Sequence, residues 1–309
     1  IYDTGGYFII DGKEKVIVAQ ERITTNRLFV SKIEDDNLSH KGLIKCTADK
    51  GESVLAPKSV EFYLVKNDAQ SENFIEKRGS ILCTFKGINN SKIPLFVLFR
   101  VLGVETDKEI YNLIFGCDLN EIEKSFFDNF IRPSIECGSI LYKQEDAFNY
   151  LKPLSTYKTI DHIKSILLTE IFPNIPIFEN KIKYLGYLTK QFINICLNIS
   201  TESDRDSYIY KRVDISGYLL SQLFYESYVK LRKYIRDSLD RTYNYGAWKT
   251  TNNYDAFINE NNIYKIIPSL IITKSFSRSL KGMWGLDDED DPELGMVQDL
   301  SRISYIGFL

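Results

Sequence analysis

The 309-residue sequence has few of the residues on which catalytic and metal-binding sites usually depend. Its only histidines are His40 and His162. Its five cysteines, which include no Cys-x-x-Cys pair, are Cys46, Cys83, Cys117, Cys137 and Cys196. A structural zinc site needs clustered cysteines and histidines, and a disulfide framework needs regularly spaced cysteines. Ser/His/Asp or Cys/His catalysis needs a histidine. The composition therefore argues against all three, and it predicts that the cysteines are small buried apolar groups.

Two further features are missing, a long apolar run and an excess of one charge. No apolar run has the length of a membrane span or resembles a secretory leader, so we expect a soluble intracellular chain with no membrane partner. Lys and Arg number 39 against 42 Asp and Glu, which gives a net charge of −3. Because no overall field attracts nucleic acid, any basic surface must be local.

The residues that are present are typical of a folded globular protein, with 44% hydrophobic and 13% aromatic content. The length exceeds that of a usual single domain, so we expect two domains or one domain inserted in another. Near the start, the β-rich runs 7–10 and 16–19 flank Asp11-Gly12, a dipeptide that supplies the positive φ values of a type I′ turn. This pattern predicts a β-hairpin. Further strands are expected at 60–65 and 81–85, with polar loops between the strands.

The apolar period changes from residue 93 onward. Leu95, Leu98 and Leu102 share one face of a predicted helix that Gly103 is expected to end. Further helices are expected at 119–130, 145–151, 160–171, 181–197 and 216–240. The apolar positions of the longest helix follow the 3.6-residue period, which indicates core packing. The predicted fold class is α+β, with a β-hairpin near the N-terminus and long helices in the second half.

The C-terminal part contains a basic stretch followed directly by an acidic one. In "TKSFSRSLKGMWG", Lys274 and Arg278 alternate with Phe276 and Trp284. The following "LDDEDDPELG" is acidic and interrupted by proline. Its acidic run, 287–291, lacks the alternating ligand positions, the central glycine and the terminal glutamate of a calcium loop. We therefore expect a solvated loop and no metal site.

Charges of alternating sign are concentrated at the start of "SDRDSYIYKRVDISGYLLSQLF", residues 203–224. One explanation is a solvated loop, in which exposed ion pairs stabilise little. The other is a short connection held by ion pairs and hydrogen bonds. Asp214 or Ser216 can also cap the helix that follows. The candidate junction residues are Asp204, Arg205, Asp206, Lys211, Arg212 and Asp214.

The chain resembles part of the second-largest, β-like subunit of multisubunit DNA-dependent RNA polymerases of the eukaryotic, archaeal or large-DNA-virus type. Five stretches occur in the family's order: "GGYFIIDGKEKVIVAQER", "IPLFVLFRVLGV", "GCDLNEIEKSFFDNFIRPSIECGSILYKQEDAFNYL", "DRDSYIYKRVDISGYLLSQLF" and "GMVQDLSRISYIGFL". The first and fourth stretches are the most specific. The resemblance covers the whole chain, but only an internal part of such a subunit.

The resemblance implies a mixed lobe domain inserted in a partial protrusion domain. It assigns 1–22 to the first part of the protrusion, 23–210 to the lobe, 211–280 to the return segment of the protrusion, 281–298 to a fork-loop-like acidic loop, and 299–309 to the start of the hybrid-lining segment. The alternating charges then lie where the chain leaves the lobe, and they would fix this junction by local pairing. Arg212→Ala should destabilise the fold by about 1–3 kcal/mol if Arg212 is buried. The acidic loop would point away from nucleic acid or help to keep strands apart.

Four side chains fall on positions that the family places near nucleic acid: Lys15, Arg278, Gln298 and Arg302. Backbone contacts from such groups hold nucleic acid without reading its sequence. For Lys15 the alternative is an ordinary solvent-facing strand residue. For Arg302 it is a pairing with Asp299 on a helix, because i and i+3 positions are neighbours there.

The function implied by the resemblance is to line the DNA cleft and to position DNA and the RNA–DNA hybrid during transcription. The alternative is that the lobe is chiefly a docking platform for general initiation factors. The chain would act as part of a nucleotidyltransferase complex with the largest and other subunits. It would have no cofactor of its own and be inactive alone, because the Mg²⁺ ligands of the complete polymerase lie mainly on the largest subunit. Its location would be the nucleus, or the cytoplasm or virion if viral.

Overall fold

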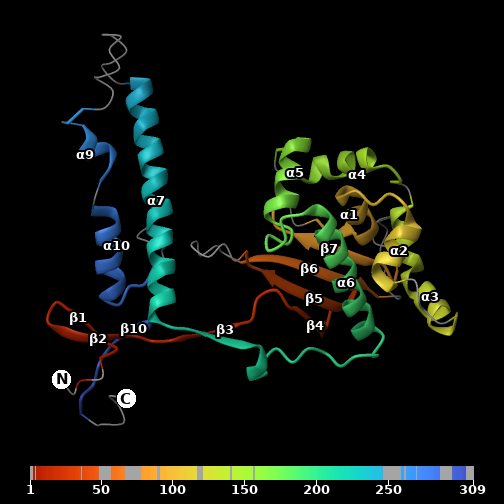
Figure 1. Ribbon diagram of the computed structural model, residues 1–309, viewed down its shortest axis with the longest axis horizontal. Coiled ribbons are helices and arrows are strands. Elements are labelled where there is room, and N and C mark those ends of the chain that lie inside the picture. The colour runs from red at the N-terminus through yellow and green to blue at the C-terminus, as the bar shows by residue number, and fades with distance from the viewer. Residues whose placement is uncertain are drawn as a thin grey trace. The chain divides into compact units, whose positions relative to one another are not determined.

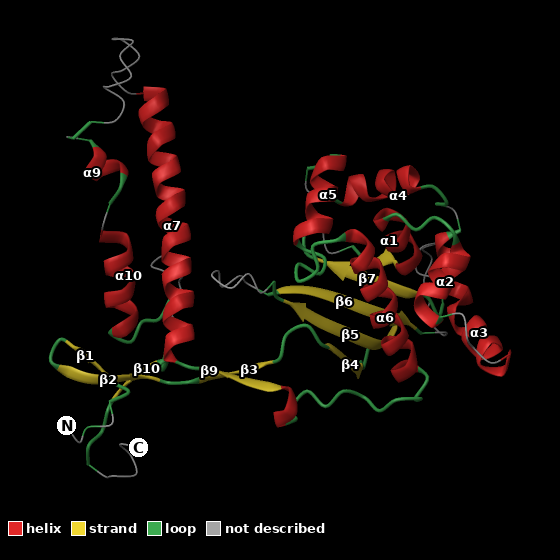
Figure 2. Cartoon of the chain, viewed as in Figure 1, coloured by secondary structure: helices red, strands yellow, loops and turns green. Residues whose placement is uncertain are grey.

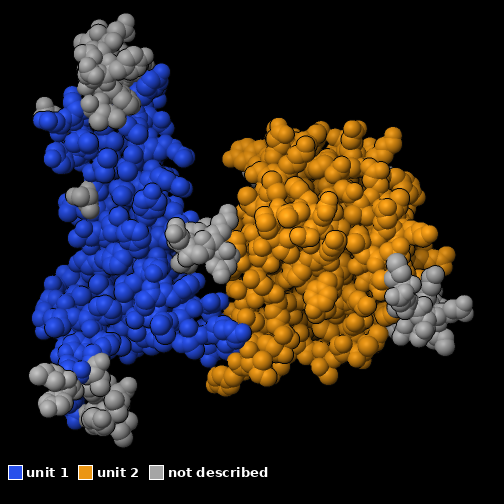
Figure 3. Space-filling model, in the orientation of Figure 1, with its two compact units in different colours: residues 1–22, 52–54, 211–309 blue, residues 23–51, 55–210 orange. Residues whose placement is uncertain are grey.

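The chain divides into two compact units (Figure 3). The computed structural model describes residues 3, 5–35, 37–48, 57–66, 78–88, 91–116, 121–139, 141–155, 157–245, 259–260, 262–268, 270–285 and 294–303, with the backbone alone for 121–126 and 129. Unit 1 contains the described residues up to Arg22 and from Lys211 onward, and unit 2 contains those from 23 to 210. Unit 2 is therefore an insertion in the sequence of unit 1. The names lobe and protrusion stay a prediction.

Unit 2 is built on a five-stranded antiparallel sheet of order β4-β5-β6-β7-β8 (Figure 1). Its strands are β4 (Leu28–Lys32), β5 (Leu38–Cys46), β6 (Lys58–Val65), β7 (Ile81–Phe85) and β8 (Ile93–Pro94). Side chains alternate between the two faces of a strand, so one face of the sheet is buried in the core and the other is open.

The helices of unit 2 pack on the buried face of this sheet. They are α1 (Leu95–Leu102), α2 (Asp107–Phe115), α3 (Glu121–Gly138), α4 (Gln144–Leu151), α5 (Ile160–Thr169) and α6 (Phe178–Cys196), with 3₁₀ turns η1 (Lys152–Leu154) and η2 (Tyr208–Tyr210). As predicted, α1 ends at Gly103, whose φ of 114° is in the left-handed region that favours glycine.

One row of residues across the sheet shows how the core of unit 2 is packed. Val30, Gly42 and Phe62 lie side by side on β4, β5 and β6. Phe192 of α6 packs on this row, with its ring centroid 5.9 Å from that of Phe62. A Cβ atom at Gly42 would lie 3.0 Å from the Phe192 ring. The glycine therefore lets the helix approach the sheet closely, and both aromatic rings are fully buried.

Unit 1 begins with the predicted hairpin, β1 (Phe8–Ile10) and β2 (Lys13–Ile17). The turn residues Asp11 and Gly12 have φ values of 51° and 78°, as a type I′ turn requires. The distant strand β10 (Val297–Asp299) pairs with β2 and completes a three-stranded sheet of order β1-β2-β10. A second pair joins β3 (Gln20–Ile23) to β9 (Lys211–Asp214), so the segments just before and after the insertion are bonded to each other.

The helices of unit 1 are α7 (Ser216–Tyr245), α9 (Ile263–Ile266) and α10 (Leu270–Leu280) (Figure 2). A small apolar cluster joins the start of α7 to the sheet: Ile17, Leu219, Leu223, Trp284, Met296 and Val297. Beyond this cluster α7 and α10 meet through small side chains, and the Ser227 hydroxyl lies 2.8 Å from that of Ser275, both buried. Small residues let the two helices approach, but they bury little apolar area.

The described elements make the fold α+β, with antiparallel strands first and helices later. Strands β4 and β5 were missed in the sequence, and most of the polar loop predicted between 60–65 and 81–85 lies outside the described residues. In β5 every second residue is buried, but His40 and Gly42 occupy two of these positions and conceal the apolar alternation. Helix α10 was also missed, since its buried positions are Ser275 and Ser279. In the described part of the chain no helix is long and apolar enough to cross a membrane.

Candidate functional site

Two of the four predicted nucleic-acid residues lie on neighbouring strands of the unit 1 sheet, but on opposite faces. Lys15 of β2 is directly opposite Asp299 of β10, and its Nζ lies 2.9 Å from the Asp299 Oδ1. This hydrogen bond lowers the pKa of the Asp299 carboxyl. Only 15% of the Lys15 side chain is exposed. Lys15 therefore holds β10 against β2, which contradicts the solvent-facing alternative, and its contact to nucleic acid stays a prediction.

Arg302, just beyond β10, makes a bidentate pair with the hairpin. Its Nε lies 2.5 Å from Oε2 of Glu14 and its Nη2 lies 3.0 Å from Oε1. The Glu14 hydrogen bond is the main reason that the pKa of Arg302 is raised. The Leu300 N–H also donates to the Glu14 carbonyl at 2.9 Å. The alternative of an Arg302–Asp299 pair on a helix was wrong, because the segment is extended and each residue has another partner.

Gln298 directly precedes Asp299 on β10. It is opposite Val16 in the ladder, and side chains directly opposite each other share a face of the sheet. The face that carries Gln298 is thus the one opposite to the Lys15–Asp299 pair. The Gln298 side chain is exposed, and its Nε2 donates to the Gly295 carbonyl at 3.2 Å.

Arg278 lies apart from these three residues in sequence, in the last turn of α10, and is half-buried. Its backbone carbonyl accepts from the N–H groups of Lys281 and Met283, which ends the helix. The next cation, Lys281, pairs with Asp11 of the hairpin turn at 2.8 Å. The end of α10 is therefore linked to the hairpin through Lys281.

Three of the six junction candidates lie on β9, and two of these pair with residues of β3. Asp214 Oδ1 accepts from the Arg22 Nε at 2.8 Å, and Lys211 Nζ lies 2.6 Å from the Glu21 Oε1. The partners are about 190 positions away in the sequence. The ion pairs therefore join the two strands that flank the insertion, whereas the sequence had indicated pairing within the charge run.

The other charged residues of the run have different surroundings. Asp204 accepts from the Asp206 N–H at 2.9 Å, which forms a local turn. Arg212 is exposed and donates to the Lys211 carbonyl at 2.8 Å, so the burial on which its expected destabilisation depended is absent. Arg205 is exposed and lines a cleft on the open face of the unit 2 sheet.

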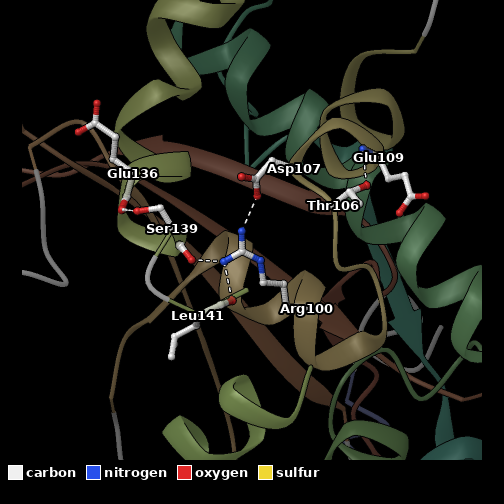
Figure 4. A network of polar contacts seen from close by, with 8 residues as sticks. Arg100, Thr106, Asp107, Glu109, Glu136, Ser139 and Leu141 are labelled. Atoms are coloured by element: carbon white, nitrogen blue, oxygen red, sulfur yellow. Dashed lines mark hydrogen bonds and ion pairs between the residues drawn. The ribbon is translucent and has the colours of Figure 1, made fainter. Parts of the chain in front are cut away.

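Two buried cations in unit 2 could be mistaken for functional groups. Arg100 donates to the carbonyls of Gly138 and Leu141 and pairs with Asp107, which joins three helical segments (Figure 4). Lys181 donates to three carbonyls at the end of α5, at 2.6 to 2.9 Å, and burial lowers its pKa to about 8. Helix C-termini leave such carbonyls without partners, so both cations are structural caps.

In the described ranges no three His, Cys, Asp or Glu side chains are grouped so that they could hold a metal ion. The acidic run 287–291 lies outside the described residues. Cys46, Cys83 and Cys137 are buried, as predicted, whereas Cys196 is half-buried and Cys117 lies outside the described residues. Burial raises the pKa of the Cys46 thiol to about 12. A thiol with a raised pKa is a poor nucleophile. The described part of the chain therefore offers no set of metal ligands and no activated thiol.

Sequence reasoning missed the acidic partners, Glu14 and Asp299, that hold the predicted basic residues. The hairpin sequence "DGKEK" places Glu14 between two lysines, and alternation puts it on the face opposite to theirs. That signal shows which face each charge is on. It does not show that Asp299 and Arg302, nearly 300 residues later, are the partners of Lys15 and Glu14.

Comparisons with known proteins show the family of this chain. The family model described as "RNA polymerase beta subunit" matches residues 1–265. The chain is 30% identical over 328 residues to DNA-directed RNA polymerase II subunit 2 of Arabidopsis thaliana, and the match covers 100% of this chain and 25% of that protein. It is also 30% identical over 321 residues to DNA-directed RNA polymerase II subunit RPB2 of Encephalitozoon cuniculi. That match covers 100% of this chain and 26% of that protein.

A third relative belongs to another polymerase class. DNA-directed RNA polymerase III subunit RPC2 of Saccharomyces cerevisiae is 26% identical over 324 residues, with 99% of this chain and 25% of that protein covered. The chain thus spans about a quarter of the length of these relatives. The resemblance seen in the sequence is confirmed: this chain belongs to the RNA polymerase beta subunit family and corresponds to a part of the second-largest subunit.

Proposed function

We propose that this chain lines the DNA cleft of a transcribing polymerase, where it positions DNA and the RNA–DNA hybrid and carries no catalytic residue of its own. Its family membership supports a role in the transcription machinery. The observation that carries the finer proposal is the setting of Gln298, an exposed amide on a strand whose C-terminal end is fixed to the hairpin.

The fixation of β10 comes from three separate contacts. Lys15–Asp299 and Glu14–Arg302 are ion pairs that join the segment to the hairpin, and the Leu300 N–H donates to the Glu14 carbonyl. A side chain that binds a ligand must be held near its productive geometry by supporting groups. Here Lys15 and Arg302 are the supporting groups, and Gln298 is the group presented to the ligand.

An amide side chain suits the positioning of nucleic acid. It donates to phosphate and sugar oxygens without a charge, so it fixes the path of a strand without reading bases. The stronger, salt-dependent part of the attraction would come from Lys and Arg side chains of the complete assembly, because this chain has a net charge of −3.

Chemistry at the growing end of the RNA is assigned in this proposal to other parts of the polymerase. Mg²⁺ would be held mainly by the largest subunit. The partners would be the largest subunit, the other polymerase subunits, DNA and the hybrid. The location would be the nucleus, or the cytoplasm or virion in a viral system.

The proposal is tested with a labelled RNA–DNA hybrid, whose fluorescence anisotropy is followed as a polymerase assembled with the complete subunit is added. Binding should weaken steeply between about 50 and 200 mM salt. Gln298→Ala should weaken it by about fivefold, because one hydrogen bond contributes about 1 kcal/mol. Gln222→Ala, an exposed glutamine on α7, is the matched control. Equal affinity of the two variants would remove Gln298 from the interface.

A second candidate function, docking of initiation factors on unit 2, is favoured by a groove of about 680 Å³ between α1, α4, α5 and the start of α6. Apolar side chains such as Leu102, Phe148 and Leu168 line it, and Leu168 is 44% exposed. Retention of an initiation factor by a chain that binds no hybrid would support docking over positioning.

A further inference from the structure

A small cleft lies on the open face of the unit 2 sheet, the face opposite to the helices. Its volume is about 190 Å³. It is lined by Ile23, Thr24, Phe29, Ser31, Lys41, Leu43, Lys45 and Arg205. Five of these residues come from β4 and β5, and Arg205 comes from the charge run before β9. The cleft, here called the basic cleft, therefore combines two segments that are far apart in the sequence.

The floor of the basic cleft is apolar and held in place. Phe29 and Leu43 are directly opposite each other in the ladder between β4 and β5. The Phe29 ring packs edge-on against Tyr210 with centroids 5.9 Å apart, and the Arg27 guanidinium lies 3.7 Å from the Tyr210 ring centroid. Because the ring of Phe29 is fixed by these contacts, the floor is preformed.

The rim of the basic cleft is positive. Lys41 is neutralised by Glu61, whose Oε1 lies 3.0 Å from its Nζ. Lys45 and Arg205 are exposed, and neither side chain forms a hydrogen bond or an ion pair within the described part of the chain. Two cations without partners thus stand beside an apolar floor.

We infer that the basic cleft binds a short segment of a partner protein in which acidic residues flank one large apolar side chain. The apolar side chain would cover Phe29 and Leu43, and its acidic neighbours would pair with Lys45 and Arg205. Charge-assisted pairs at a rim fix the register of a segment, and the burial of an apolar group supplies affinity.

The size and shape of the basic cleft favour a peptide over nucleic acid. Pockets for small molecules have volumes of about 300–1,000 Å³, so about 190 Å³ suits a single side chain. Single-stranded nucleic acid is held by rings that expose a flat face for bases. The one ring in the floor, Phe29, is half-buried and packs edge-on against Tyr210, and the rest of the floor is aliphatic.

The placement of Arg205 also accounts for part of the charge run. Asp214 and Lys211 pair with β3, whereas Arg205 makes no such contact and faces the cleft. The inference depends on contacts within unit 2 alone. Its failure would leave the proposed role of Gln298 untouched, because that residue belongs to unit 1.

The test uses the whole chain and a fluorescein-labelled probe peptide with the core Asp-Glu-Phe-Asp-Glu. Two altered peptides carry Ala in place of Phe, or Asn and Gln in place of the acids. A single-stranded oligonucleotide of equal charge is the fourth probe. We expect the first peptide to bind, and both altered peptides and the oligonucleotide to bind at least about tenfold more weakly.

The double variant Lys45→Gln with Arg205→Gln should lose at least about tenfold in affinity for the first peptide. Both side chains are exposed, so its thermal unfolding should match that of the unmodified chain. The control is Lys108→Gln with Lys183→Gln, which removes two exposed lysines from α2 and α6. The control should keep full affinity.

Three outcomes would overturn the inference. One is absence of peptide binding at about 1 mM, a concentration that detects even weak association. Another is equal affinity of the double variant and its control. The third is tighter binding of the oligonucleotide than of the peptide, which would make the basic cleft a nucleic-acid contact.

Discussion

Helix α6 of unit 2 and helix α7 of unit 1 are both long, but they differ in how much they bury. Eight of the 19 residues of α6 are buried, whereas only three of the 30 residues of α7 are. Unit 2 has a deep apolar core under its sheet. Unit 1 has a small cluster, contacts between serines, and ion pairs between strands. Apolar burial therefore stabilises unit 2. Unit 1 depends more on polar contacts, each of which stabilises less than a buried apolar side chain.

The largest loss of stability is expected from a substitution in the core of unit 2. Phe192→Ala removes a fully buried ring between α6 and the row of residues around Gly42. The free energy of unfolding should fall by about 3–5 kcal/mol, which is typical of such a cavity. Urea unfolding followed by far-ultraviolet circular dichroism measures it. A loss below about 1 kcal/mol would show that unit 2 does not depend on this core.

Overpacking of the serine contact tests unit 1. Ser275→Leu places a large side chain between α7 and α10, where Ser227 and Ser275 are both buried, and should destabilise unit 1 by about 1–3 kcal/mol. The fluorescence of Trp284, which is buried in the unit 1 cluster, reports its unfolding. Ser277→Leu, at an exposed position of the same helix, is the control. Similar melting of both variants would contradict the close packing of these helices.

The strands that flank the insertion provide a smaller effect. Asp214→Asn weakens the pair with Arg22, whose side chain is 39% exposed, so the loss should be only about 1 kcal/mol. Arg212→Ala is the control on the same strand and should change stability by less than about 0.5 kcal/mol. Trp284 fluorescence during urea unfolding distinguishes the two variants. A larger loss in Arg212→Ala would mean that the wrong cation has been assigned to this junction.

The smallest effect is the pH dependence due to His40. Burial lowers the pKa of His40 below its ordinary value of 6.5. The unfolded chain therefore binds a proton near pH 6.5 that the folded chain binds only at lower pH, and this contribution to stability is lost as pH falls. When the pH is lowered from about 7 to about 5, the unfolding free energy of His40→Leu should fall less than that of the unmodified chain. An unchanged slope in His40→Leu would contradict the assignment.

Local elements were predictable from the sequence because their signals are local. Asp11-Gly12 specified a turn, Gly103 ended a helix, and the 3.6-residue period located α7. Strand β5 and helix α10 were missed because His40, Gly42 and Ser275 occupy buried positions that normally hold apolar residues. Their burial depends on the residues that pack against them, and those residues are distant in the sequence.

The candidate site was predictable only in part. The family pattern selected Lys15, Gln298 and Arg302, and the structure places all three in or beside one sheet of unit 1. It could not show that Lys15 and Arg302 are paired with Asp299 and Glu14, since each partner is more than 280 residues away. The supporting role proposed for Lys15 and Arg302 depends on this long-range pairing.

The central claim is that β10 presents Gln298 to nucleic acid while its ion pairs hold the strand. A photoreactive amino acid placed at position 298 of the complete subunit, in a polymerase assembled on an RNA–DNA hybrid, tests this directly. The account predicts a crosslink to a DNA or RNA strand from position 298 and none from position 222 on α7. Crosslinks from position 298 to protein alone would contradict it.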